Sequence, residues 1–92
     1  MDAAMRELLV PLTDSRRAHT IEVSRKVEHA AHQVPESLRD EVTTAAYLHD
    51  VGYGYPVSGF HQLDGAERLR TCGYSPIVCY LVAFHSASTV EA

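Results

Sequence analysis

The stretch AAYLHDVGYG, residues 45–54, decides the fold of this chain. It begins as an apolar helical run, places His49 and Asp50 side by side, and then breaks at Gly52. Burying a carboxylate costs free energy unless the group is paired or binds a metal. A His-Asp pair at the inner end of an apolar helix therefore raises the question of what the pair binds.

The sequence around this stretch has the periodicity of helices rather than strands. Proline and glycine separate five predicted helices, over about residues 2–10, 14–34, 36–50, 64–72 and 76–87, with a glycine-rich loop at 51–63. The candidate caps are Thr13 and Asp14, the capping box Asp64 and Glu67, and Ser75 before Pro76. The sequence predicts an all-α fold, a compact bundle of about five helices.

The composition indicates one small domain and excludes several classes of protein. The chain has 92 residues and a net charge of −4 with its six histidines neutral, which argues against a non-specific nucleic-acid binder. Cys72 and Cys79 form neither a disulfide framework nor zinc-binding CxxC pairs, so we expect reduced thiols in a cytoplasmic protein. The acidic N-terminus lacks the features of a signal peptide, and no apolar run approaches the ~20 residues that span a bilayer.

Three predicted helices each carry a histidine at the end or edge of an apolar face. Residues at i, i+3, i+4 and i+7 of a helix share a face. Such stripes lead to His19, His49 and His85, whereas His29 and His32 lie on other faces and should be solvated. The stripes are Val23, Val27, Ala30 and Val34; Leu38, Val42, Ala45 and Ala46; and Val78, Leu81 and Val82.

A single histidine on an apolar face is more often a core residue bonded to a carbonyl. Three inward histidines beside Asp50 form a different pattern, and His61 adds a fourth in the following loop. Neutral imidazoles and a carboxylate that converge in one bundle suit a divalent transition metal, namely Mn, Fe, Co, Ni or Zn. The sequence therefore predicts a metal site.

Four segments in order resemble the HD-domain family of metal-dependent phosphohydrolases, small bacterial members included. They are RRAHTIEVSRKV (16–27), AAYLHDVGYG (45–54), GFHQLDGAERL (59–69) and LVAFHS (81–86), and the resemblance spans about residues 12–88. It implies an all-α bundle that holds one or two metal ions. By position, His19, His49 and Asp50 would bind the first ion, and Asp50 would bridge to a second ion held by His61 and His85.

The resemblance also implies a role for Arg16, and the sequence departs from the family pattern at one point. Arg16 resembles an arginine often found before the first histidine, which implies either a phosphate contact or a structural ion pair. The family pattern ends with a further Asp ligand on a later helix. The last acid here is Glu91, only six residues after His85, which leaves too little chain for that helix. The resemblance thus implies a single HD domain over residues 1–92 that lacks the helix bearing the last Asp.

The implied function is hydrolysis of a small phosphate ester, a nucleotide included, by a metal-activated water. Asp50 would also orient the attacking water. If His61 and His85 do not bind metal, they would donate to the phosphate or act as general acid. Tyr53, Tyr55 and Phe60 would either stack on a base or close the bundle, and the second interpretation is favoured.

Two other classes of function stay open. The missing Asp favours a non-catalytic HD module, which would bind a ligand or regulate a partner with an incomplete metal site. The five candidate ligands favour the enzyme. A neighbouring subunit of a homo-oligomer would reconcile the two, if it replaced the missing helix. A Cys79–His85 nucleophile pair is permitted by spacing, but the apolar helix around Cys79 favours an inert buried thiol.

Overall fold

The computed structural model describes the backbone of residues 1–91 and the side chains of residues 1–85. Within these residues the chain contains five α-helices and three short 3-10 helices, and no strand. The prediction of an all-α bundle of about five helices is confirmed. The elements are α1 (Ala3–Leu9), α2 (Asp14–His29), η1 (Ala31–Gln33), η2 (Glu36–Leu38), α3 (Arg39–Leu48), η3 (Val51–Gly54), α4 (His61–Thr71) and α5 (Pro76–Glu91).

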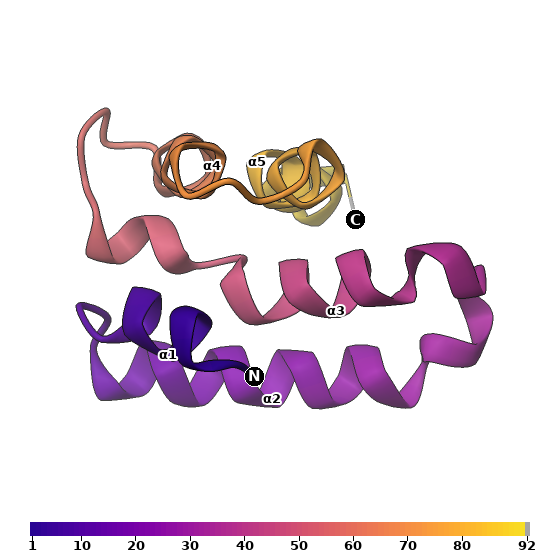
Figure 1. The fold of residues 1–92 in the computed structure, drawn as a ribbon. Helices are drawn as coiled ribbons and strands as arrows, with labels where there is room; N and C mark the ends of the chain where they lie inside the picture. Colours follow the sequence, from indigo (N-terminus) through magenta and orange to yellow (C-terminus); the bar gives the residue numbers. More distant parts are fainter. Residues whose placement is uncertain (92) are drawn as a thin grey trace.

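Helix α3 is the centre of the bundle (Figure 1). Helices α2 and α3 lie side by side and run in opposite directions, and α1 lies beside the first half of α2. Helices α4 and α5 pack on each other on the side away from α2, α5 against α3 and α4 against η3, and Figure 1 shows both nearly end-on. The C-terminal end of α3, which carries the His-Asp pair, therefore lies between α2 on one side and α4 and α5 on the other.

The core is apolar and draws on most of the helices. Leu48, Val51, Leu69 and Val82 have no exposed surface, and burial of such side chains is the main stabilising contribution to a bundle of this size. The inward faces predicted for α3 and α5 are confirmed, since the buried residues include Ala45, Ala46, Val78 and Val82. None of the described helices combines the length and the apolar character that crossing a membrane requires.

Side-chain caps fix where three of the helices begin. The Asp2 carboxylate accepts a hydrogen bond from the Met5 amide at 2.8 Å, and the Thr13 hydroxyl accepts one from the Arg16 amide at 3.2 Å. Ser75 accepts one from the Val78 amide at 3.3 Å. Each such cap typically contributes about 1 kcal/mol. The caps predicted at Thr13 and Ser75 are confirmed.

The helix predicted over residues 14–34 is shorter than expected. Helix α2 ends at His29, and the chain continues through η1 to an extended Val34. Pro35 accounts for the extended residue, because proline disfavours the helical conformation of the residue before it. The Arg39 side chain then donates to the Ala31 and Val34 carbonyls at 3.0 and 3.1 Å, so carbonyls outside the α-helix are satisfied. The next helix begins correspondingly late, at Arg39.

The loop and capping box predicted around residues 51–67 are wrong in two respects. Residues Val51–Gly54 form η3, and α4 begins at His61, three residues before Asp64. Asp64 does not cap that helix. Its carboxylate accepts hydrogen bonds from the Val57 amide at 3.0 Å and the Ser58 amide at 2.9 Å, which closes the intervening loop onto α4. His61 consequently stands on a helix rather than in a loop.

Two glycines let η3 touch the first turn of α4. A Cβ atom on Gly52 would lie 1.8 Å from the His61 carbonyl oxygen, and one on Gly65 would lie 3.0 Å from the Gly52 nitrogen. Only a residue without a side chain fits at Gly52, because the obstacle is backbone. This close approach brings the segment that follows Asp50 directly against the helix that begins with His61.

Candidate metal centre

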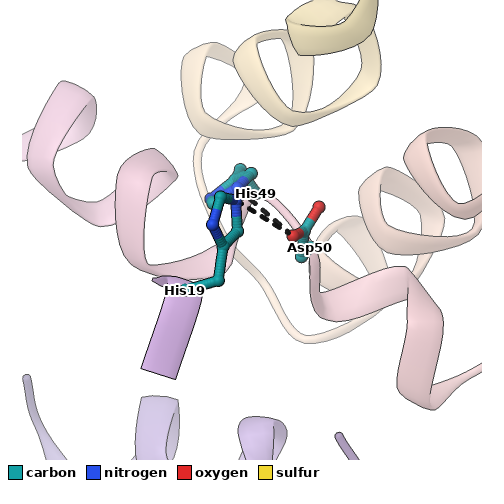
Figure 2. Close-up of side chains that lie close together, drawn as sticks. All are labelled: His19, His49 and Asp50. Carbon is teal, nitrogen blue, oxygen red and sulfur yellow. Dashed lines mark ion pairs between the residues drawn. The ribbon is translucent and has the colours of Figure 1, made fainter. Parts of the chain in front are cut away.

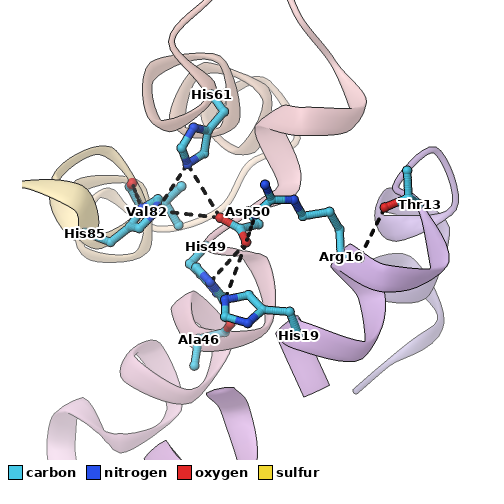
Figure 3. Close-up of polar contacts among 9 residues, drawn as sticks. All are labelled: Thr13, Arg16, His19, Ala46, His49, Asp50, His61, Val82 and His85. Atoms are coloured by element: carbon cyan, nitrogen blue, oxygen red, sulfur yellow. Dashed lines mark hydrogen bonds and ion pairs between the residues drawn. The ribbon is translucent and has the colours of Figure 1, made fainter. Parts of the chain in front are cut away.

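Asp50 lies at the centre of the predicted site. Its side chain is only 5% exposed. Its Oδ2 atom lies 3.4 Å from His49 Nε2 and 3.9 Å from His19 Nε2, and its Oδ1 atom lies 3.5 Å from His61 Nε2 and 3.7 Å from His85 Nε2 (Figure 3). The four histidines singled out from the sequence thus converge on the predicted carboxylate, one from each of four segments.

The five side chains form two overlapping groups that share Asp50. The first group is His19, His49 and Asp50 (Figure 2), and the second is Asp50, His61 and His85. In each group the ligand atoms all lie within 4.8 Å of one another, so each group could hold one metal ion. Neither group contains a second carboxylate among the side chains that the structure describes.

Backbone carbonyls orient two of the four imidazoles. His49 Nδ1 lies 2.7 Å from the Ala46 carbonyl oxygen, and His85 Nδ1 lies 2.6 Å from the Val82 carbonyl oxygen (Figure 3). A carbonyl oxygen can only accept a hydrogen bond, so Nδ1 carries the hydrogen in both rings. In the neutral rings Nε2 then carries a lone pair on the side that faces Asp50. A ring whose Nδ1–H is bonded to a carbonyl and whose Nε2 is free to bind is the usual form of a metal-binding histidine.

The polar atoms of this cluster are not satisfied by one another. Asp50 Oδ2 is buried and has no hydrogen-bond partner among the described residues. The nearest nitrogen, His49 Nε2, presents a lone pair to it, so the two atoms repel unless a cation or a proton lies between them. A buried unsatisfied acceptor is costly. A divalent transition metal would remove this cost, and the nitrogen and carboxylate ligands suit such an ion.

Burial and the charges of the cluster shift the pKa of three of its members. Burial opposes protonation of His49, but its contacts with Asp50 and the Ala46 carbonyl outweigh burial and raise its pKa. Burial likewise opposes ionisation of Asp50, but its contact with His49 and the charges of the neighbouring histidines lower its pKa. Burial lowers the pKa of His61 despite the nearby carboxylate. The directions for Asp50 and His61 favour the ionised carboxylate and the neutral imidazole, which are the forms that bind a metal, whereas His49, when protonated, would have to release that proton before its Nε2 could bind one.

His19 lies at the rim of the cluster, so the prediction that its side chain faces the core is wrong. Its side chain is 52% exposed. The fully buried residues of α2 are Thr20 and Ser24, while Val23 and Val27 are only half-buried. A hydrogen bond of 2.8 Å from the Ser24 hydroxyl to a carbonyl in the same helix lets this polar residue face inward. The buried face of α2 is thus turned by one residue from the predicted apolar stripe.

The two histidines predicted to be solvated are outside the cluster. His29 and His32 are both exposed, at the end of α2 and in η1. Their predicted exposure is confirmed, but the predicted contrast with an inward His19 on the same helix is not, because His19 is also exposed.

Arg16 and Tyr53 extend the cluster towards the surface. Arg16 Nη1 lies 3.6 Å from Asp50 Oδ2, so the ion pair, one of the two alternatives for this arginine, is present. Its guanidinium carbon also lies 4.0 Å from the centroid of the Tyr53 ring. Tyr53 stacks on His61 with 4.0 Å between ring centroids and 13° between ring planes. The sequence did not indicate this role for Tyr53, although its place three residues after Asp50, one helical turn on, is a signal that could have done so.

The other two aromatic residues of this segment do not reach the cluster. The Tyr55 hydroxyl donates to the Leu8 carbonyl at 3.0 Å, and the Arg68 guanidinium lies 4.1 Å over its ring. Tyr55 therefore closes the bundle, which is the interpretation that the sequence favoured. Phe60 is 65% exposed.

Two cavities and the two thiols lie apart from the cluster. A cavity of about 460 Å³ lies beside Leu8 and Arg68, and one of about 690 Å³ lies beside Leu63 and Tyr80. No histidine lines either cavity, so the chemistry places the candidate site at Asp50 instead. Both cysteines are free, and burial raises the pKa of the Cys79 thiol, which fits an inert side chain rather than a nucleophile.

The fold and the site place this chain in one class of protein. It is a helical domain built around a candidate metal centre, a buried carboxylate surrounded by four imidazoles. Residues 16–92 match the HD domain family, and because the match covers most of the chain, this protein belongs to that family. The family is one of metal-dependent phosphohydrolases, as the sequence resemblance implied. No match was found among the curated proteins or among the solved structures.

Glu91 was expected to lie too close to His85 to serve as a further ligand. It ends α5, and its side chain lies outside the described residues. The absence of a helix that carries a last Asp ligand stays a prediction from the family resemblance.

Proposed function

We propose that this chain is a metal-dependent phosphohydrolase that acts on a small phosphate ester, nucleotides included. One observation carries the proposal: each oxygen of Asp50 faces two imidazole nitrogens, at distances between 3.4 and 3.9 Å. This geometry supports His19, His49 and Asp50 as the residues that would hold one ion, and Asp50, His61 and His85 as those that would hold a second. The ligand types favour Mn, Fe, Co, Ni or Zn.

The chemistry divides between the ion and the side chains. When bound, the ion lowers the pKa of a water molecule and offsets negative charge on a phosphoryl group. Asp50, ionised near pH 7, accepts a hydrogen bond from the attacking water and so orients it. Arg16 is half-exposed beside Asp50 and donates to a phosphoryl oxygen, as a guanidinium does well.

His61 and His85 have different capacities if only the first group binds an ion. The hydrogen of His85 is on Nδ1, bonded to the Val82 carbonyl, so the Nε2 atom of the neutral ring only accepts. His61 Nε2 lies 3.4 Å from His85 Nε2 and can carry a hydrogen. If that hydrogen turns from His85 Nε2 to the substrate, His61 is the better donor of the two to the phosphate or the leaving group.

The surroundings of the cluster support recognition of the phosphate rather than of a base. The Tyr53 ring is already in contact with Arg16 and His61, so it offers no free face on which a base can stack. The net charge of −4 also disfavours a polyanionic substrate such as a nucleic acid. A small ester held by its phosphate is the substrate that these features favour.

The test is metal analysis followed by assay. Protein purified without a chelator or a His tag is analysed by elemental mass spectrometry, and the Mn- and Co-loaded forms are assayed against nucleotides, cyclic nucleotides and simple phosphate monoesters. We expect one or two equivalents of a transition metal and hydrolysis that Asp50→Asn abolishes and His29→Ala leaves intact. A wild-type protein that takes up no metal after loading would contradict the proposal.

A non-catalytic HD module is the second candidate, and one observation favours it. Asp50 is the only carboxylate in the two groups of described side chains, and His19 is half-exposed. A site of this kind would bind a metal and a phosphorylated ligand without turnover. Metal uptake with no hydrolysis of any ester in the panel, together with saturable phosphate binding, would select this candidate.

A further inference from the structure

We infer that Tyr53 is a positioning residue, whose ring holds Arg16 and His61 on opposite sides of the shared carboxylate. The inference rests on the proposed function, because it assigns Tyr53 to the same site. Tyr53 is new to the site. Its side chain does not contact Asp50, and it is not one of the proposed metal ligands.

The ring of Tyr53 lies between two cationic or ionisable groups. The Arg16 guanidinium carbon and the His61 ring centroid each lie 4.0 Å from the Tyr53 ring centroid. Two groups this close to the same centroid would overlap if they shared a face, so they occupy opposite faces. Both contacts are attractive, one as a cation–π contact and one as a parallel ring stack.

Through these contacts Tyr53 links the two residues that lie beside the two oxygens of Asp50. Arg16 Nη1 lies 3.6 Å from Asp50 Oδ2, and His61 Nε2 lies 3.5 Å from Asp50 Oδ1. Tyr53 therefore joins the neighbour of one carboxylate oxygen to the neighbour of the other. The backbone amide of Tyr53 donates to the Asp50 carbonyl at 3.1 Å, so Tyr53 and Asp50 belong to the same short turn.

His61 needs such a support more than two of the other histidines do. His49 and His85 are each anchored through Nδ1 to a backbone carbonyl one turn away. No carbonyl of the described residues anchors His61 in this way, so besides its Nε2 contacts with Asp50 and His85 the stack on Tyr53 is what fixes the plane of its ring. A ligand whose orientation is fixed loses less entropy when a metal binds.

The ring of Tyr53, and not its hydroxyl, makes these contacts. The side chain is 42% exposed at the edge of the cluster, and its hydroxyl has no hydrogen bond to any described residue. Phenylalanine should therefore replace tyrosine at this position with little effect, whereas a leucine keeps the bulk and loses the stack.

The experiment compares Tyr53→Leu, Tyr53→Phe and the matched control Tyr80→Leu, an exposed tyrosine on α5 that packs on Phe84 away from the cluster. Two quantities are measured: the NMR shifts of the His61 ring protons without metal, and Co²⁺ binding by titration. We expect Tyr53→Leu to remove the ring-current shift of His61 and to weaken one of two Co²⁺ equivalents about tenfold. Tyr53→Phe and Tyr80→Leu should stay within about twofold of wild type.

An unchanged His61 ring shift in Tyr53→Leu would overturn the inference, whatever the metal content. So would Co²⁺ affinities in Tyr53→Leu equal to those of the wild type, or an equal loss in Tyr53→Phe. Neither readout depends on turnover. A wild type that binds Co²⁺ and hydrolyses no ester would end the proposed function and leave the inference on Tyr53 standing.

Discussion

The two histidine groups that share Asp50 differ in how firmly the protein holds them. In the first group His49 is anchored to a backbone carbonyl, but His19 is half-exposed and reaches Asp50 from the rim. In the second group the His61 and His85 side chains are only 20% and 22% exposed, and each has a support, a ring stack for one and a carbonyl for the other.

The difference shows that the conspicuous part of a motif need not be the most preorganised part of its site. The adjacent His49 and Asp50 draw attention to the first group in the sequence. The structure holds the second group more firmly, with ligands that lie far from this pair in the chain. Side-chain supports decide this, and most of them come from other elements of the fold.

Removing the shared carboxylate should have the largest effect, because it breaks both groups at once. We expect Asp50→Ala to lose all bound transition metal and any hydrolysis, measured by elemental mass spectrometry and ester assay on protein whose helicity is checked by circular dichroism. Asp40→Ala, at an exposed position on α3, is the control and should keep the metal. One equivalent retained by Asp50→Ala would show that the groups do not share this ligand.

Gly52→Ala should damage the second group through the backbone. The added Cβ would meet the His61 carbonyl oxygen at 1.8 Å, so the start of α4 must move. We expect a loss of about 3 kcal/mol or more in the free energy of unfolding by urea. Gly59→Ala is the control, since its Cβ would meet nothing and only the φ of +89° is strained, at about 1–2 kcal/mol. Equal losses in the two variants would refute the close approach.

Single histidine deletions should sharpen the comparison between the groups. We expect His85→Ala to weaken one metal equivalent about 100-fold and His19→Ala to weaken one about tenfold, because water can replace a half-exposed ligand more easily. The measurement is a competitive Co²⁺ titration. His29→Ala, also exposed on α2, should change nothing. A loss in His29→Ala equal to that in His19→Ala would mean that the orientation of α2 is wrong.

The smallest effect should appear in acid, at the loop that closes onto α4. Hydrogen bonds from the Val57 amide and from Ser58 lower the pKa of Asp64. Because the folded-state pKa lies below the unfolded value of about 3.9, the stabilisation is complete above that value and is lost as the pH falls through the folded-state pKa. Thermal unfolding of the metal-free protein should therefore show a shallower acid dependence in Asp64→Asn. An unchanged pH dependence would contradict this role.

Simple apolar patterns predicted the fold and the inward His49 and His85, whereas His61 was assigned to the cluster through the family resemblance. The faces of α3 and α5 follow apolar stripes, so the inward placement of His49 and His85 could be worked out from spacing. The orientation of α2 could not be predicted in this way, because its buried residues are Thr20 and Ser24. The periodicity of apolar residues cannot identify polar residues that face inward.

The remaining errors concern local geometry that other segments decide. Glycines made residues 51–63 resemble a loop, but one of them, Gly52, serves a close backbone contact with the first turn of α4. The role of Tyr53 also depends on Arg16, which a different helix supplies, so the spacing of Tyr53 from Asp50 indicates only part of it.

The backbone contact at Gly52 also bears on how an ion reaches the site. Since η3 lies directly against the first turn of α4, with no side chain between them, the backbone that follows Asp50 directly contacts the turn that carries His61. His19 reaches Asp50 from the separate helix α2. Its side chain is 52% exposed, against 13% for His49, 20% for His61 and 22% for His85, so the cluster is most open at His19. An incoming ion should therefore pass on the α2 side of Asp50, and His19 should be the last ligand to close over it.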